Sequence, residues 1–143
     1  MATYVPIYRC ALIREGSVPT EPQLTSTLKA RAACNEFLAD SPNEQLVVVL
    51  LDVKNRVISL SPISAGTLDA SLVHPREVFR PAILHNCSSI IIAHNHPSGD
   101  LTPSRQDREC KARLQKAGEL LGISCLDFII VDGIGNTLSL CES

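Results

Sequence analysis

Residues 88–107 have the sequence SSIIIAHNHPSGDLTPSRQD, an apolar run followed by a dense group of polar side chains. The run 88–93 is rich in β-branched residues, which predicts a buried strand. The Pro, Ser, Gly and Asp of 97–100 predict a turn-rich loop. Ser104 then begins a predicted helix that continues to about Leu121 and stops at Gly122. The stretch therefore predicts a strand–loop–helix unit of an α/β fold.

The rest of the chain predicts further strands and helices around this unit. Two helices are expected, at 23–38 and 75–86, and Pro81 predicts a kink or break in the second because its ring removes a backbone donor. The other strands are expected at 4–13, 44–53, 56–64, 124–131 and 137–141. Hairpins interrupt the alternation of strands and helices. The predicted fold class is therefore α/β with a mixed sheet flanked by helices, an α-β-α sandwich.

Length and charge limit the possible partners. A chain of 143 residues, 45% of them hydrophobic, is the size of one domain with an aliphatic core. The net charge is −2 and aromatics are 3% of the chain, so neither a basic footprint nor a base-stacking platform is expected. Five basic residues fall on the predicted solvent face of the helix after Ser104, and a nucleic-acid partner is not favoured: Arg105, Arg108, Lys111, Arg113 and Lys116.

Cysteine spacing and the N-terminal residues bear on the cellular compartment. No two of the six cysteines are spaced as C-x-x-C, so neither a zinc ribbon nor a thioredoxin-like motif is present. Residues 1–10 lack the basic and apolar regions of a secretory signal, and the apolar runs are too short to cross a bilayer. We therefore expect a cytoplasmic protein that does not associate with membranes.

Two histidines and an aspartate suggest a metal site. His94 and His96 are two residues apart at the end of the predicted strand, so their side chains share one face. Asp107 lies in the first turn of the predicted helix and points back towards the strand end. Three nitrogen and oxygen ligands with one open position are the pattern of a catalytic zinc site, because structural sites are closed by four ligands and usually include Cys.

Other polar residues of this region have alternative explanations. A hydrolytic metal site also needs a general base, and Glu44, Glu77 and Asp100 are all candidates. Ser104 and Asp107 form an S-x-x-D pattern, which by itself indicates a helix capping box. The letters H-N-H at 94–96 do not indicate a nuclease of that name, because its three residues lie on separate elements. The H-x-E and P-C-x-x-C signature of the deaminases is missing.

The spacing of the polar residues resembles that of a known superfamily. His94-x-His96, seven residues, Ser104, two residues and Asp107 match the H-x-H-x7-S-x2-D pattern of the JAMM (MPN-plus) metalloproteases. Within it the chain resembles the RadC family from about Tyr4 to Leu140. The segments that carry the resemblance are EQLVVVLLDVKNRVIS, AGTLDASLVHPREVFRPAI, IIAHNHPSGDLTPSRQD and LDFIIVDG.

The resemblance implies a site and an activity. It implies a zinc ion held by His94, His96 and Asp107 with a water as fourth ligand, Glu44 as the acid/base, and Ser104 as a residue that stabilises the oxyanion. Similar enzymes cleave peptide or isopeptide bonds in protein or peptide substrates, and their fold resembles that of the cytidine deaminases.

The chain also departs from the family pattern. Residues 1–143 are expected to form a single JAMM domain without the N-terminal helix-hairpin-helix region of RadC proteins. Phe128 stands where the family commonly has His, and the ubiquitin-recognition insertions have no counterpart. A RadC-type DNA-repair accessory or metal-dependent nuclease is the alternative function, and a non-catalytic interaction module is a third.

Overall fold

The computed structural model describes residues 1–17, 27–63 and 73–141, with the side chains of the first helix described from residue 30 onwards. The helices are α1 (Thr27–Phe37), α2 (Pro75–Leu84) and α3 (Arg105–Leu121). The strands are β1 (Leu46–Leu51), β2 (Val57–Ile63), β3 (Ser89–Asn95), β4 (Ser124–Val131) and β5 (Thr137–Ser139). The predicted start of the first helix, at 23–26, lies outside the described residues.

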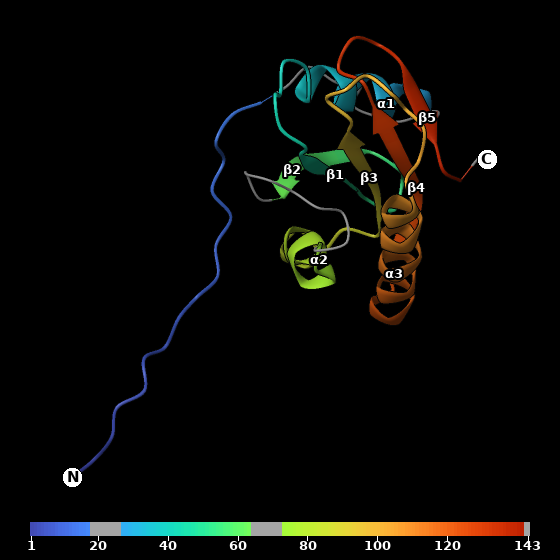
Figure 1. The fold of residues 1–143 in the computed structure, drawn as a ribbon. Coiled ribbons are helices and arrows are strands. Elements are labelled where there is room, and N and C mark those ends of the chain that lie inside the picture. The colour runs from blue at the N-terminus through green and yellow to red at the C-terminus, as the bar shows by residue number, and fades with distance from the viewer. Residues whose placement is uncertain (18–26, 64–72, 142–143) are drawn as a thin grey trace.

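The five strands form one mixed sheet in the order β2-β1-β3-β4-β5 (Figure 1). Strand β1 is antiparallel to both β2 and β3. Strands β3 and β4 are parallel and are joined through α3, while β5 is antiparallel to β4. The predicted α/β fold with a mixed sheet is therefore confirmed.

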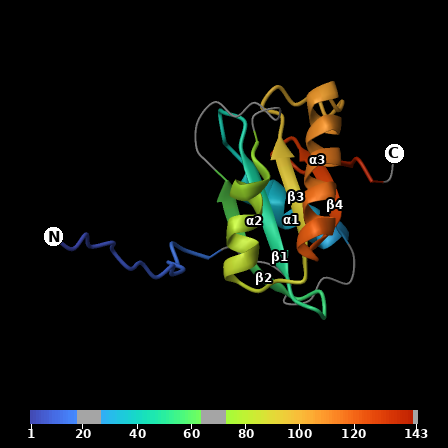
Figure 2. The same ribbon diagram turned by 90° about the horizontal axis from the view of Figure 1, so that it is seen from below.

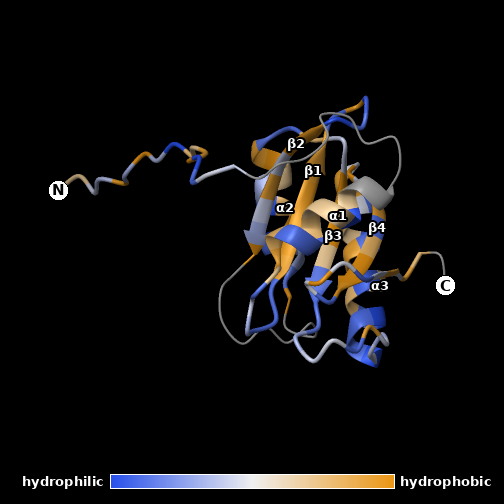
Figure 3. Ribbon diagram, turned by 90° about the horizontal axis from the view of Figure 1, so that it is seen from above, coloured by the Kyte–Doolittle hydropathy of each residue, from blue (hydrophilic) through white to orange (hydrophobic). Residues whose placement is uncertain are grey.

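Helices cover both faces of the sheet. Alternate residues of a strand point to opposite faces, and β1 is apolar at every position. Its Leu46, Val48 and Leu50 pack in the core shared with α2 and α3. Its Val47 and Val49 pack in a second core with α1. Figure 2 shows α2 and α3 in front of the sheet with α1 behind it, and Figure 3 shows the hydrophobic colouring of the strands between these layers.

The ends of α3 are fixed by its own sequence. Ser104 is the N-cap, and its hydroxyl accepts a hydrogen bond of 3.1 Å from the backbone N–H of Asp107. The carboxylate of Asp107 in turn accepts one of 2.8 Å from the backbone N–H of Ser104. Gly122 ends the helix at a φ of 73°, a left-handed conformation that favours glycine. The predicted capping box and stop signal are both confirmed.

The structure contradicts the strand predicted at 4–13 and the break predicted at Pro81, while the kink at Pro81 stays a prediction. Residues 4–13 do not form a strand, because a strand requires a partner and this segment extends away from the sheet (Figure 1). Tyr4, Ile7 and Ile13 are each at least 85% exposed. Pro81 does not break α2, which continues to Leu84. A proline within a helix removes a single N–H donor, and the last turn of α2 forms without it.

Deletion of residues 2–16 is expected to leave the folded domain almost unchanged in stability. The segment buries no large apolar side chain against the sheet, and surface changes of this kind alter stability by about 0.5 kcal/mol or less. Thermal unfolding of the truncated chain should give a Tm within about 3 °C of the full chain. Leu50→Ala, at a fully buried position of β1, should cost about 2–5 kcal/mol in the same assay. A large destabilisation by the deletion would show that the segment packs against the domain.

Candidate metal centre

Both histidines lie at the C-terminal end of β3, at one end of the sheet. His94 is opposite Leu46 of β1 and Ile130 of β4, and its side chain is only 2% exposed. His96 follows β3, and its backbone N–H donates a 3.0 Å hydrogen bond to the carbonyl of Val131, which continues the pairing with β4. The two rings meet edge to face with centroids 5.1 Å apart. The prediction that both rings share one face is confirmed.

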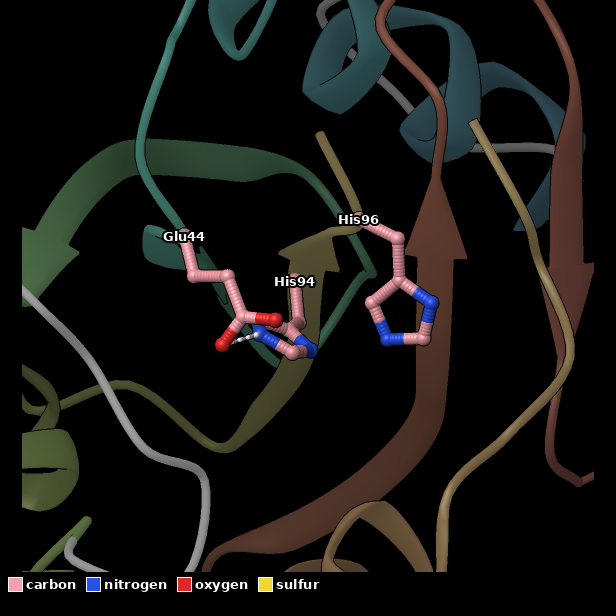
Figure 4. Close-up of side chains that lie close together, drawn as sticks. All are labelled: Glu44, His94 and His96. Atoms are coloured by element: carbon pink, nitrogen blue, oxygen red, sulfur yellow. Dashed lines mark ion pairs between the residues drawn. The ribbon is translucent and has the colours of Figure 1, made fainter. Parts of the chain in front are cut away.

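Glu44 is brought to the histidines by the pairing of β1 with β3. It lies two residues before β1, and one of its carboxylate oxygens is 3.5 Å from Nε2 of His94. Figure 4 shows the three side chains pointing towards one another. Together Glu44, His94 and His96 form a group that could hold a metal ion, with one ligand atom of each within 4.8 Å of the others.

The other two candidate bases are engaged elsewhere. Glu77 lies on α2, 40% exposed, and pairs with Arg80 at 3.1 Å. The carboxylate of Asp100 accepts a 2.9 Å hydrogen bond from the backbone N–H of Thr102, within the loop before α3. Of the three acids considered from the sequence, only Glu44 makes an ion pair with either histidine of the centre.

Asp107 contacts both histidines from the start of α3. One carboxylate oxygen is 3.3 Å from Nδ1 of His94, and the other is 3.1 Å from Nε2 of His96. The side chain is 1% exposed. The residue therefore caps its helix and faces the two rings at once, so the capping and the metal-site interpretations of Ser104 and Asp107 are compatible.

The loop after His96 orients its ring. Nδ1 of His96 lies 2.7 Å from the backbone carbonyl of Asp100. A carbonyl oxygen can only accept, so this nitrogen carries the proton and Nε2 is left with a lone pair. That lone pair faces a carboxylate oxygen of Asp107 at 3.1 Å. Two electron-rich atoms at this distance require a cation between them, either a second proton on the ring or a metal ion.

The protonation of the site reflects this arrangement. The hydrogen bond to Asp107 raises the pKa of His96, against the opposing effect of burial. Burial alone would raise the pKa of Asp107, but the neighbouring His94 and His96 rings and the Ser104 N–H outweigh it, and the net pKa lies well below its ordinary value. Asp107 is therefore a carboxylate at neutral pH, the form that binds a cation.

His94 has unsatisfied nitrogens. Both ring nitrogens are buried and make no hydrogen bond within the described residues, although carboxylate oxygens of Asp107 and Glu44 lie 3.3 and 3.5 Å away. These contacts have ion-pair distances without hydrogen-bond geometry. Buried polar atoms are normally satisfied, so the site is suited to a cation that the histidine could bind.

Two features of the centre were not predicted from the sequence. The carbonyl of Asp100 orients His96 through the backbone, which no side-chain pattern reveals. Asn95, between the two histidines, is 3% exposed and bonds to the backbone on both sides of Glu44. Its position in an H-x-H pattern, on the face of β3 opposite the rings, is the signal that could have identified it.

The remaining predictions concern residues outside the centre. Burial raises the pKa of the Cys34 and Cys125 thiols to about 12, so both thiols stay protonated at neutral pH. Phe128 is fully buried in the core beneath α2 and α3. The basic side chains of α3 lie on its surface as predicted, except Lys111, which is partly buried and donates to the carbonyl of Leu140.

No helix among the described residues is long and apolar enough to cross a bilayer.

Comparison with known proteins gives a family match over most of the chain. Residues 24–143 match the model of the RadC-like JAB domain. A UPF0758 protein of Rubrobacter xylanophilus is 48% identical over 113 residues, 79% of this chain and 50% of that protein. One from Symbiobacterium thermophilum is 55% identical over 94 residues, 66% of this chain and 40% of that protein. The chain therefore spans about half the length of these curated relatives.

Proposed function

The chain belongs to the RadC-like JAB domain family, and on that premise we propose that it is a zinc-dependent hydrolase of peptide or isopeptide bonds. The observation that carries the proposal is that Nε2 of His96 faces a carboxylate oxygen of Asp107 at 3.1 Å, beside a buried His94 whose two ring nitrogens make no hydrogen bond within the described residues. Ring nitrogens and carboxylate oxygens that face one another in this way support a bound cation.

The donor set fits zinc. Two imidazoles and one carboxylate are the ligands of catalytic zinc sites, and these sites keep a fourth position open. Ligand distances of about 2.0–2.1 Å place neighbouring atoms of a tetrahedron about 3.3 Å apart. The two carboxylate oxygens of Asp107 lie at comparable distances from the rings, Oδ1 at 3.3 Å from Nδ1 of His94 and Oδ2 at 3.1 Å from Nε2 of His96. We assign His94, His96 and Asp107 as the ligands.

Glu44 fits the role of general base better than that of a ligand. Its side chain is 40% exposed, whereas those of His94 and Asp107 are 2% and 1% exposed. A carboxylate at the rim of the centre can take a proton from an attacking water and return it to the leaving amine, exchanging with solvent between turnovers. A zinc ion in the centre would polarise the scissile carbonyl and lower the pKa of a bound water from about 15.7 towards 7.

Ser104 is placed to stabilise the reacting carbonyl. Its hydroxyl accepts from the Asp107 N–H, which leaves its own proton available to donate. It lies at the N-terminus of α3, where the helix dipole also favours negative charge. We assign Ser104 as the donor to the oxyanion that forms when the carbonyl is attacked.

Zinc binding is expected to stabilise the folded protein. A ligand that binds only the folded state adds about 2.7 kcal/mol at 100 times its Kd, so the metal-free protein should gain Tm on titration with zinc, at one ion per chain. His96→Ala should lose this gain, whereas His74→Ala, at an exposed N-cap position that makes no side-chain cap bond, should keep it. A wild-type protein that neither binds zinc nor gains Tm would contradict the proposal.

Hydrolysis is tested on peptides. The zinc-loaded protein is incubated with a tryptic digest of a bacterial proteome and with a branched peptide containing a lysine isopeptide bond, and new termini are read by mass spectrometry. Cleavage that depends on zinc supports the proposal. Zinc binding with no new termini from either substrate would remove the peptidase assignment while leaving the metal centre intact.

A further inference from the structure

The residue between the two histidines is bonded to the chain around Glu44. Asn95 is the last residue of β3, and the alternation of the strand points its side chain away from the face that carries His94 and His96. The side chain is buried, at 3% exposure for the residue. The side chain therefore faces away from the proposed metal position, and its amide group makes hydrogen bonds to the backbone of a neighbouring segment.

Three hydrogen bonds join Asn95 to the segment before β1. Its side-chain oxygen accepts from the backbone N–H of Gln45, and its side-chain nitrogen donates to the backbone carbonyl of Asn43 at 3.1 Å. Its own backbone N–H donates to the carbonyl of Gln45 at 3.3 Å. The amide orientation is fixed by these partners, because the N–H can only donate and the carbonyl can only accept.

The bonds bracket Glu44, which is the residue between Asn43 and Gln45. Glu44 lies outside β1, so the regular ladder of the sheet does not hold its backbone. Its side chain is part-exposed and makes one ion pair within the described residues, to His94 at 3.5 Å. Without the bonds from Asn95, the peptide units on both sides of Glu44 would lose their anchor to β3.

We propose that Asn95 is a positioning residue that holds Glu44 beside the metal centre by clamping the peptide units before and after it. The end of β3 thereby positions two groups. The side chains on one face are the proposed metal ligands His94 and His96, and the Asn95 side chain on the other face holds Glu44 in place. This inference rests on the proposed function for the role of Glu44, but the clamp itself is a statement about backbone hydrogen bonds.

The clamp is tested first by hydrogen exchange, a measurement that does not depend on enzymatic activity. In the zinc-loaded protein, Asn95→Ala should raise the hydrogen-exchange rate of the Gln45 amide about tenfold or more, as expected for a lost hydrogen bond. The amides of Val48 and Val49, within β1, should exchange as before, and zinc should still bind at one ion per chain. Unchanged exchange at Gln45 would overturn the inference, whatever the activity of the protein.

The consequence for catalysis is tested on a peptide that the wild type cleaves. Asn95→Ala should lower kcat about 100-fold with KM unchanged, because a displacement of about 1 Å of a catalytic group costs that much. In a Glu44→Gln background the same change should cause no further loss, since Asn95 acts through Glu44. Full additivity of the two losses would overturn the inference.

Two variants separate positioning from general stability. Asn95→Asp keeps the acceptor for Gln45 but places an oxygen against the carbonyl of Asn43, so its kcat should fall between those of Asn95→Ala and the wild type. Asn35→Ala removes another buried asparagine, which donates to the carbonyl of Asn136 at 3.0 Å. It should lower Tm with kcat unchanged. A fall in kcat in Asn35→Ala equal to that in Asn95→Ala would identify the effect of Asn95 as a loss of stability.

The two proposals fail in different ways. A wild-type protein without zinc or cleavage counts against the hydrolase, and amide exchange at Gln45 in the metal-free protein then still decides whether Asn95 clamps the chain. A wild-type hydrolase whose rate survives Asn95→Ala counts against the positioning role alone.

Discussion

Glu44→Gln is expected to lower peptide hydrolysis by about 10²–10⁴-fold while the bound zinc remains. General acid–base catalysis by a positioned carboxylate contributes rate enhancements of this size. Glutamine has nearly the same shape but cannot take up a proton at neutral pH. Because the ligands we assign are His94, His96 and Asp107, the substitution should leave one zinc per chain by metal analysis.

Metal analysis of Glu44→Gln together with its rate distinguishes a general base from a metal ligand at this position. Glu44 also belongs to the Glu44–His94–His96 group that could hold a metal, so a loss of zinc together with the loss of rate would identify it as a ligand. Glu77→Gln is the matched control, since that residue pairs with Arg80 on the surface of α2, and its rate should stay at the wild-type level. Wild-type rates in Glu44→Gln would remove the residue from the mechanism.

The proximity of His94, His96 and Asp107 could be predicted from the sequence because it follows from short-range rules. The period of two within β3 places His94 and His96 on one face, and the capping box places Asp107 in the first turn of α3. Each rule involves residues within a few positions of one another. The loop between them connects a strand end to a helix start, so its ends meet in space without further information.

From the residues alone, the general base could only be limited to three candidate acids, of which Glu44 is one. Its place beside His94 depends on β1 lying antiparallel to β3 with Leu46 opposite His94. That register joins residues about fifty positions apart, and it is decided by burial of both faces of β1 rather than by any local pattern. The resemblance to the RadC family singled out Glu44 as the expected acid/base, and the fold supplies the physical reason for its place beside His94.

The same limit explains the wrong strand and the missed asparagine. Residues 4–13 are apolar enough for a strand, but a strand needs a partner edge, which local composition does not reveal. Asn95 acts on the backbone of Asn43 and Gln45. Its position between the two histidines marks it in the sequence, but its partners became visible only with the register of β1 and β3.

Asp107→Asn is expected to abolish zinc binding while the protein remains folded. Asparagine fills the same volume and keeps an oxygen that can accept from the Ser104 N–H, so the start of α3 is retained. It lacks the negative charge that the cation requires between the two histidines. Loss of even a hydrogen-bond partner of a metal ligand costs about 10–100-fold in affinity, so loss of the ligand charge should cost more than 100-fold.

Two further variants on the same helix separate metal binding from capping. Ser104→Ala removes the hydroxyl that accepts from the Asp107 N–H and should cost about 0.5–2 kcal/mol of stability, yet it should bind zinc because no ligand is lost. Glu109→Gln changes an exposed acid that pairs with Arg105 and should alter neither property. If Asp107→Asn bound zinc with wild-type affinity, Asp107 would be a helix cap only, and the ligand set would have to be Glu44, His94 and His96.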